Sequence, residues 1–191
     1  MRSACWTEKK RQKPSQNSRD FSADSCQLSR SNGRTLSTAG AIGIHIRGKI
    51  RGKMIEYITT SHSITADMLS GFFAGWPTPP SPETHLRILR NSHFVVLAVD
   101  RQAGRVVGFV NAVSDGTLSA YIPLLEVLPT HQGQGIGTAL VERMLAQCAE
   151  LYMVDTTCDA AVLPFYAKCG MLPSTGAMVR NYVRQSGSGA P

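Results

Sequence analysis

The stretch Tyr121–Ala149 constrains the fold more than any other part of the chain. Its first part, Tyr121–Val127, is mostly apolar and contains branched side chains, which predicts a largely buried strand. Pro129 has no N–H to give to a ladder and predicts the end of that strand. Beyond it come alternating glycines and apolar residues with the spacing of one helix face: Gly133, Gly135 and Gly137, with Ile136, Ala139, Leu140, Met144 and Leu145. We therefore expect a strand, a glycine turn and a helix, in that order.

A glycine turn between a strand and a helix has a specific chemical use. Glycine permits backbone conformations closed to other residues, and it lets a ligand come within hydrogen-bonding distance of the main chain. The first N–H groups of a helix have no intrahelical partner and lie at the positive end of its dipole, which suits a phosphate. We interpret the turn as a diphosphate-binding site; the competing interpretation is a strand-to-helix corner that binds nothing.

The spacing of the glycines separates this turn from two common phosphate loops. A P-loop needs a lysine after its last glycine, where this chain has Thr138, and the dinucleotide fingerprint needs G-x-G-x-x-G, where this chain has G-x-G-x-G. The residues match Q-x-x-G-x-G instead, and this resembles the acyl-CoA-binding signature of the GNAT N-acetyltransferase superfamily. The resemblance implies that acetyl-CoA is the cofactor and that it is bound at Val127, Gln132, Gly133, Gln134, Gly135, Ile136, Gly137 and Thr138.

A second stretch, Asp159–Met171, resembles the other recurrent GNAT element, Asn-x-x-Ala-x-x-Phe-Tyr-x-x-x-Gly-Phe. It matches that pattern at Phe165, Tyr166 and Gly170, and departs from it at Asp159, Val162 and Met171. In the family the residue at the first position can reach toward the cofactor through an amide donor, which Asp159 lacks. We therefore assign Asp159 no cofactor contact.

The two signatures together imply a fold and an activity. The fold class is α/β with a GNAT-like architecture, in which helices flank a mixed, mostly antiparallel sheet. The activity is acetyl-CoA-dependent N-acetylation of a primary amine on a small molecule, peptide or protein. An alternative from another class is a non-catalytic acyl-CoA-binding sensor or interaction module, which would tolerate the substitutions Tyr166→Phe and Glu126→Gln.

Acetyl transfer from a thioester to an amine needs a proton donor for the departing thiolate and a neutral amine. The resemblance implies that Tyr166 is the donor and that the strand splays after Val127, which frees main-chain N–H groups. Glu126 is the acid of the cofactor strand; because strand residues alternate faces, we expect it opposite Leu125 and Val127. Glu126 is a candidate base, acting directly or through a water, or a residue that binds a cationic acceptor. For Tyr166, the alternative to proton donation is a packed residue whose hydroxyl makes only a structural hydrogen bond.

Periodicity predicts the remaining elements. We expect helices over Ser63–Phe73, with Ser63 or Thr65 as cap, over Glu83–Asn91, and over the stretch from Asp159, as cap, to Lys168. The expected strands are Met54–Thr60, His93–Val99, Val106–Val113, Leu118–Val127, Leu151–Thr157 and Met178–Val183.

The acceptor site has no recognisable code in the sequence. The proline-rich loop Gly75–Pro82 and the segment Pro173–Met178 are expected to shape it, with Trp76 either lining the pocket or closing the core. We do not expect His93 or His131 to act as a base, and His131 is expected to flank phosphate. A homodimer is one option, since a final strand can pair within or between chains.

Charge divides the chain into a basic tail and a domain. The formal net charge is +7, but residues 1–53 carry twelve Lys/Arg against three Asp/Glu, and the remainder carries eight against ten. The Ser-rich tail has no sustained periodicity before Ala41, so we expect 1–53 to be disordered, 54–185 to form the acetyltransferase domain and 186–191 to be a flexible end. The preferred interpretation takes Met54 as the native start; a transit peptide and a nucleic-acid-binding arm are the alternatives.

Cysteine usage and hydropathy bear on metal binding, cellular compartment and membrane association. The five cysteines form no C-x-x-C pair and no spacing typical of zinc, so we expect free thiols, no metal site and a cytoplasmic location. The sequence has no run of eighteen or more apolar residues, and a membrane partner is not expected.

Overall fold

The computed structural model describes residues 46–50, 53–180 and 182–187, all within one structural unit. Strand β1 (Ile46–Ile50) lies before Met54, within the stretch expected to be a tail, and pairs with the next strand. The disorder expected for residues 1–45 and the flexibility expected for 188–191 concern parts of the chain outside this description.

The described strands form one sheet in the order β1-β2-β3-β4-β5-β6. Neighbours are antiparallel except for β5 and β6, which are parallel. After β1 the strands are β2 (Lys53–Ile58), β3 (Phe94–Asp100), β4 (Arg105–Ser114), β5 (Ser119–Val127) and β6 (Met153–Thr156). The helices are α1 (Pro82–Arg90), α2 (Ile136–Gln147) and α3 (Leu163–Lys168). The expected mixed sheet with its antiparallel run into β5 is confirmed.

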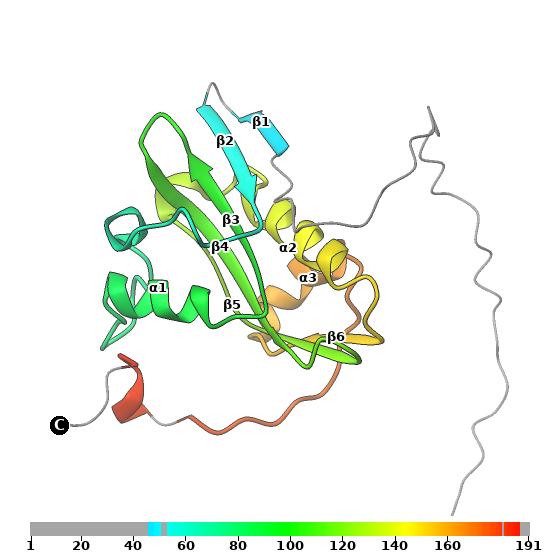
Figure 1. Cartoon of the computed structure of the whole chain (residues 1–191). Coiled ribbons are helices and arrows are strands. Elements are labelled where there is room, and N and C mark those ends of the chain that lie inside the picture. The colour runs from blue at the N-terminus through cyan, green and yellow to red at the C-terminus, as the bar shows by residue number, and fades with distance from the viewer. Residues whose placement is uncertain (1–45, 51–52, 181, 188–191) are drawn as a thin grey trace, which may run out of the picture. The chain divides into compact units, whose positions relative to one another are not determined.

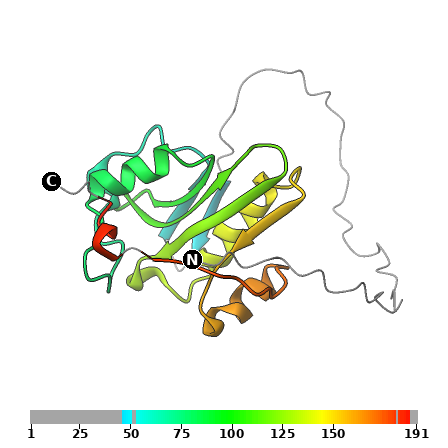
Figure 2. The same cartoon turned by 90° about the horizontal axis from the view of Figure 1, so that it is seen from below.

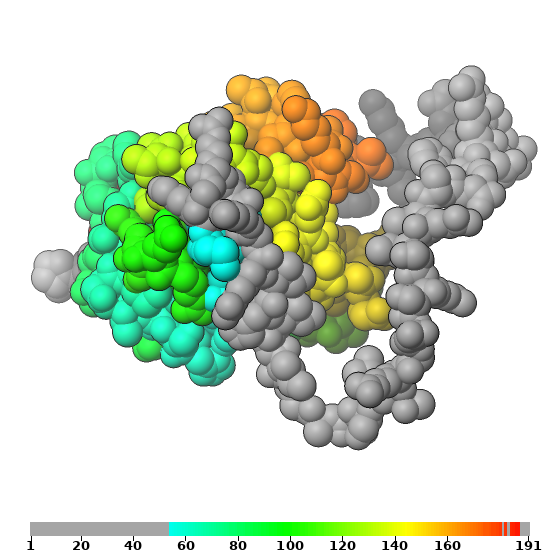
Figure 3. Space-filling view, turned by 90° about the horizontal axis from the view of Figure 1, so that it is seen from above, coloured from blue at the N-terminus to red at the C-terminus, as the bar shows by residue number. Residues whose placement is uncertain are grey.

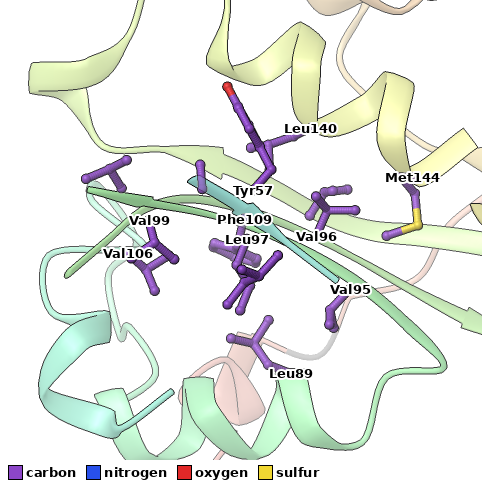
Figure 4. Packing of buried hydrophobic residues seen from close by; sticks show 14 of the residues in the cluster. Tyr57, Leu89, Val95, Val96, Leu97, Val99, Val106, Phe109, Leu140 and Met144 are labelled. Carbon is purple, nitrogen blue, oxygen red and sulfur yellow. The ribbon is translucent and has the colours of Figure 1, made fainter. Parts of the chain in front are cut away.

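Helices cover both faces of this sheet because its central strands are apolar on both faces. Six of the seven residues of β3 are buried, which requires cover on each side. Leu89 of α1 packs on one face, and Leu140 and Met144 of α2 pack on the other (Figure 4). Gly108 of β4 lets α2 approach closely, since a Cβ there would lie 3.1 Å from Leu140 and 3.2 Å from Ile136. Figure 1 shows α2 and α3 on the same side of the molecule.

The expected helix over Ser63–Phe73 is wrong. One 3₁₀ turn, η1 (Ala66–Leu69), forms there, and Thr65 makes no side-chain cap bond to it. Gly71 has a φ of 89° and Phe73 a φ of 60°, and neither value continues a right-handed helix. The chain turns inward instead and buries Phe72 and Phe73.

The expected last strand, Met178–Val183, is also wrong. The chain from Met171 to Arg180 carries no regular structure, and a 3₁₀ turn, η4 (Tyr182–Arg184), follows. The end of the described chain binds the region of α1: the Thr78 N–H donates to Gln185 Oε1 at 3.3 Å, and Arg87 donates to the Gly187 carbonyl at 2.8 Å. Figures 1 and 2 show this segment leaving α3 and running to α1.

Local signals account for how α1 and α3 begin. At α1, Ser81 accepts a hydrogen bond from the Thr84 N–H at 3.2 Å and a proline follows at the first helical position. At α3, Asp159 instead precedes a separate 3₁₀ turn, η3 (Ala160–Val162), without a side-chain cap bond, so its expected capping role is wrong. None of the helices in the described part of the chain has both the length and the apolar character needed to cross a bilayer.

Candidate acyl-CoA site and acceptor cavity

Strands β5 and β6 run together over four residue pairs and then separate. Ser119–Ile122 pairs with Met153–Thr156, and the last pair is Ile122 with Thr156. Pro123 comes next and has no N–H to continue the ladder. The far half of β5 stays paired with β4 while its other edge is open. The separation therefore begins at Pro123, earlier than the expected point after Val127.

The glycine turn after β5 is held by its own side chains. It starts with the 3₁₀ turn η2 (Pro129–His131). Gln132 donates from its amide to the Val127 carbonyl at 2.9 Å, and Gln134 donates to the Thr130 carbonyl at 3.2 Å. Both glutamine side chains thus shape the turn. The part of the turn that can face a ligand is its main chain.

Two glycines of the turn have conformations that other residues rarely adopt. Gly133 has a φ of 68° and Gly135 a φ of 79°. A Cβ built on either would meet no atom within 4 Å, so the space beside both is open. Gly135 is the N-cap of α2 and gives it no side-chain cap bond. The open space and the uncapped start of the helix fit a bound diphosphate.

The first residues of α2 differ in what they can offer. Ile136 is buried at 1% exposure and contributes its side chain to the core, so its main chain alone can face a ligand. Gly137 and Thr138 are half-buried. A Cβ on Gly137 would lie 3.5 Å from the ring of Phe165, so the second signature packs directly on the first. Figure 3 shows the turn and α3, in yellow-green and orange, side by side.

The structure contradicts the expected role of His131 beside phosphate. This residue is 7% exposed, and its Nε2 lies 3.8 Å from Asp100 Oδ2. Its Nδ1 lies 2.9 Å from the Thr130 hydroxyl. The ring therefore points into the protein, away from the open side of the turn. His93, at the start of β3, lies beside Gly116 in the turn before β5, away from Glu126 near the other end of that strand.

Tyr166 of α3 is placed where β5 and β6 separate. It is 7% exposed, and burial raises its pKa above the ordinary value, partly offset by a hydrogen bond with Thr156. The Thr156 hydroxyl donates to the Ile122 carbonyl at 2.9 Å, at the last pair of the ladder. Thr156 therefore links Tyr166 to the opening, a contact that no sequence pattern indicated.

Glu126 points to the face that alternation predicts. It pairs with Phe109, whose ring lies against His85 of α1, whereas Val127 lies beside Gly108 and Gly137 toward α2. Both carboxylate oxygens accept the Phe73 N–H, at 2.8 and 3.0 Å. Phe73, with its positive φ, is the one non-glycine residue of that kind in the described ranges. No sequence pattern indicates this contact, which joins residues 53 positions apart.

A cavity of about 360 Å³ opens beside Glu126. Its lining includes Phe73, Ala74 and Trp76 from the loop before α1, and Leu124, Leu125 and Gln132 from β5 and the turn after it. Trp76 is 38% exposed, and its ring centroid lies 5.1 Å from that of Phe73. Of its two expected roles, lining the pocket and closing the core, the structure has the first. Pro173–Met178 contributes nothing to the lining of this cavity, against expectation.

Comparisons with known proteins agree with this arrangement. A family model of the acetyltransferase (GNAT) family matches residues 61–171. The crystal structure of an acetyltransferase candidate from Deinococcus radiodurans R1 is 46% identical, with a TM-score of 0.68, covering 71% of this chain and 94% of that one. A GNAT-family acetyltransferase structure from Streptococcus pneumoniae is 30% identical, with a TM-score of 0.55, covering 67% of this chain and 98% of that one.

Curated relatives match over a shorter range. An uncharacterized N-acetyltransferase of Pyropia yezoensis is 27% identical over 101 residues, 51% of this chain and 58% of its own length. A chloroplastic GCN5-related N-acetyltransferase of Arabidopsis thaliana is 39% identical over 69 residues, 35% of this chain and 29% of its own. The match thus spans little more than half of the first relative and less of the second. The signatures, the fold and the family match all agree, and the chain belongs to the GNAT acetyltransferase family.

Proposed function

We propose that the chain is an acetyl-CoA-dependent N-acetyltransferase that acts on a primary amine of a small molecule, peptide or protein. The observation that carries the proposal is the opening between β5 and β6. It has the glycine turn at one end and Tyr166 at the other, with Glu126 and its cavity on the face of α1. Membership of the GNAT family supports acyl-CoA as the donor.

The main chain of this region is suited to hold acetyl-CoA. The amides of residues 133–138 would bind the diphosphate, because Gly133 and Gly135 leave open space there and α2 starts uncapped. The open edge of β5 beyond Pro123 would bind the pantetheine arm through backbone groups such as those of Val127. The cofactor supplies an acetyl thioester when bound.

Tyr166 would give a proton to the departing thiolate. Its raised pKa keeps the phenol protonated at neutral pH, and its proton, which is hydrogen-bonded to the Thr156 hydroxyl, would pass to the thiolate. Its position at the last β5–β6 pair places the hydroxyl at the start of the opening.

Glu126 would act on the acceptor amine. A carboxylate has about four lone-pair sites, so accepting one N–H from Phe73 leaves it able to accept more bonds from the cavity. It can remove the amine proton, directly or through a water, or hold a cationic amine in place. These two roles remain alternatives that the kinetics of Glu126→Gln would separate: loss of kcat indicates a base, and a raised KM indicates binding.

The proposal is tested by incubating the full chain with acetyl-CoA and a panel of amines while free thiol is measured, with calorimetry of acetyl-CoA in parallel. Tyr166→Phe is compared with Tyr152→Phe, an 82% exposed tyrosine, to control for loss of a phenol hydroxyl. Heat of binding with thiol release that Tyr166→Phe alone reduces supports the enzyme. Binding without release from any amine supports the non-catalytic module, and no binding at millimolar ligand rejects both.

Location and assembly are proposed on narrower grounds. A cytoplasmic location follows from cysteine usage, while the chloroplastic description of the Arabidopsis relative makes a plastid the alternative. A homodimer is proposed because several large apolar side chains of the C-terminal segment are exposed, including Leu172, Met178 and Tyr182. Fluorescent tagging and sedimentation test these two proposals.

A further inference from the structure

A second cavity lies next to the acceptor cavity on the face of α1. Its volume is about 420 Å³, and its lining includes Arg87, Ser92, Asn111, Val113, Pro123 and Leu124. Leu124 also lines the cavity beside Glu126, so the two cavities adjoin along β5. A ligand at Glu126 that reaches past Leu124 would enter this second space.

Asn111 of β4 is a buried polar residue in the lining of the second cavity. It is 1% exposed, and its Oδ1 is buried without a hydrogen-bond partner among the described residues. A buried acceptor that lacks a donor costs about 1–3 kcal/mol, which favours any ligand that brings a donor. This atom is the feature that nothing else in the site explains.

The hydrogen bonds around Ser92 fix which way the amide of Asn111 faces. The Ser92 hydroxyl donates its one proton to the Ile88 carbonyl at 2.8 Å. It can therefore only accept from Asn111, which lies 2.8 Å away, so the Asn111 atom facing Ser92 is the nitrogen. The oxygen faces the other way, and the group it lacks is a donor.

The sheet register sets the spacing between Asn111 and Glu126. Asn111 pairs with Leu124 and Phe109 pairs with Glu126, so Asn111 and Glu126 are diagonal neighbours on one face. Diagonal neighbours in an antiparallel pair lie about 7–8 Å apart. An acceptor whose amine meets Glu126 would thus present a second group to Asn111 roughly five bonds of chain further along.

The charge of the lining selects the kind of donor. Arg87 is the charged residue of this lining, and no acid contributes to it. Its guanidinium donates to the Gly187 carbonyl at 2.8 Å and is paired with no acid of the lining. A second ammonium group on the substrate would be repelled by the Arg87 charge, because no acid of this lining offsets it. A neutral amide or hydroxyl would not be repelled.

We propose that this second cavity is an acceptor subsite, in which Asn111 Oδ1 accepts a hydrogen bond from a neutral amide N–H or hydroxyl of the amine substrate. The inference rests on the proposed acetyl transfer and narrows its acceptor to amines that carry such a group at a separation comparable with the spacing of Asn111 and Glu126, about 7–8 Å. Simple diamines are thereby disfavoured. Asn111 is a specificity residue in this account and takes no part in proton transfer.

Four matched amines test the subsite with the full chain and acetyl-CoA. They are the amide of δ-aminovaleric acid, its N,N-dimethyl derivative, n-pentylamine and cadaverine, which share one chain length. The expected order of kcat/KM places the primary amide first, about tenfold or more above the dimethylamide, which cannot donate. Cadaverine is expected last.

Two variants test whether Asn111 and Arg87 cause this order of kcat/KM among the amines. In Asn111→Leu the ratio of amide to dimethylamide should fall to about one. Arg87 is an exposed residue of α1. In Arg87→Gln the ratio of amide to dimethylamide should persist, while kcat/KM for cadaverine should rise toward that for the primary amide. Each ratio is taken within one variant, so a general loss of rate cancels, and melting curves confirm that the variants fold.

Several results would overturn the subsite. One is equal kcat/KM for the amide and the dimethylamide in the wild type, and another is an unchanged ratio of these two in Asn111→Leu. The others are an unchanged disadvantage of cadaverine in Arg87→Gln, and transfer to none of the four amines. The last result leaves the proposed function to be judged separately by acetyl-CoA binding and the wider amine panel. If Asn111→Leu does not fold, the Arg87→Gln arm and the wild-type ratios still decide.

Discussion

Replacing Glu126 tests whether this carboxylate holds the loop before α1 as well as serving the acceptor. In the structure it accepts the Phe73 N–H with both oxygens, at 2.8 and 3.0 Å, while Phe73 has a φ of 60°. A left-handed backbone at a bulky residue costs about 1–3 kcal/mol and persists where the surroundings enforce it. The Glu126 carboxylate is the hydrogen-bond acceptor for this backbone N–H, and we expect it to hold the conformation.

The magnitude follows from the kind of bond lost. A hydrogen bond to a charged group contributes about 1.5–3 kcal/mol and a neutral one about 0.5–1.5 kcal/mol. Glu126→Gln keeps one neutral acceptor and should therefore lower the free energy of unfolding by about 1 kcal/mol. Glu126→Ala removes the acceptor and releases Phe73, which should cost about 3 kcal/mol. At this chain length the corresponding falls in Tm are about 2–4 °C and 6–12 °C.

The assay is thermal unfolding of the full chain, with Glu142→Gln as the matched control. Glu142 is an exposed acid on α2, and its replacement should change the free energy of unfolding by less than about 0.5 kcal/mol. A Glu126→Ala variant that melts with the Glu142→Gln control would refute the reasoning, because the loop would then keep its conformation without the carboxylate.

Three further predictions concern other residues. Tyr166→Phe should lower kcat by about 10²-fold or more while acetyl-CoA still binds. Because burial raises the pKa of Tyr166 above its ordinary value, wild-type kcat should show no fall assignable to this phenol between about pH 7 and pH 9. Gly108→Ala should cost about 1–3 kcal/mol in urea unfolding, since its Cβ would lie 3.1–3.3 Å from Leu140, Ile136 and Val127, whereas Gly176→Ala, with its nearest atom at 3.7 Å, should be neutral. Burial lowers the pKa of His85 to about 4, so the unfolded chain binds the extra proton first, and the free energy of unfolding should fall by up to about 3 kcal/mol as pH drops from 6.5 to 4; a His85→Leu variant that keeps the full acid sensitivity contradicts this.

Local patterns predicted the sheet and the cofactor helix well. The order from β3 through β5 to α2 follows from apolar runs, turn residues and glycine spacing, all of which act within a few residues. Alternation along β5 also predicted the face of Glu126. The same local rules failed over Ser63–Phe73, where helix spacing was overruled by burial of Phe72 and Phe73 against α1 and β4.

Contacts between distant segments could not be predicted. The bond between Phe73 and Glu126, the link from Tyr166 through Thr156 to Ile122, and the inward turn of His131 toward Asp100 each depend on the finished fold. The absence of a final strand has the same cause, since Gln185 and Gly187 bind near α1 instead of a sheet edge. Sequence thus supplied candidate site residues, and packing determined which residues they contact.

Pro123 has a consequence beyond ending a ladder. A strand in mid-sheet normally has no backbone groups to spare, whereas β5 changes along its length from an interior strand to an exposed border. An extended, amide-bearing arm can join such a border as a substitute strand. Inhibitors with a peptide-like backbone would pair with the same unpaired edge of β5. The residue at position 123 would determine how far along β5 they could pair.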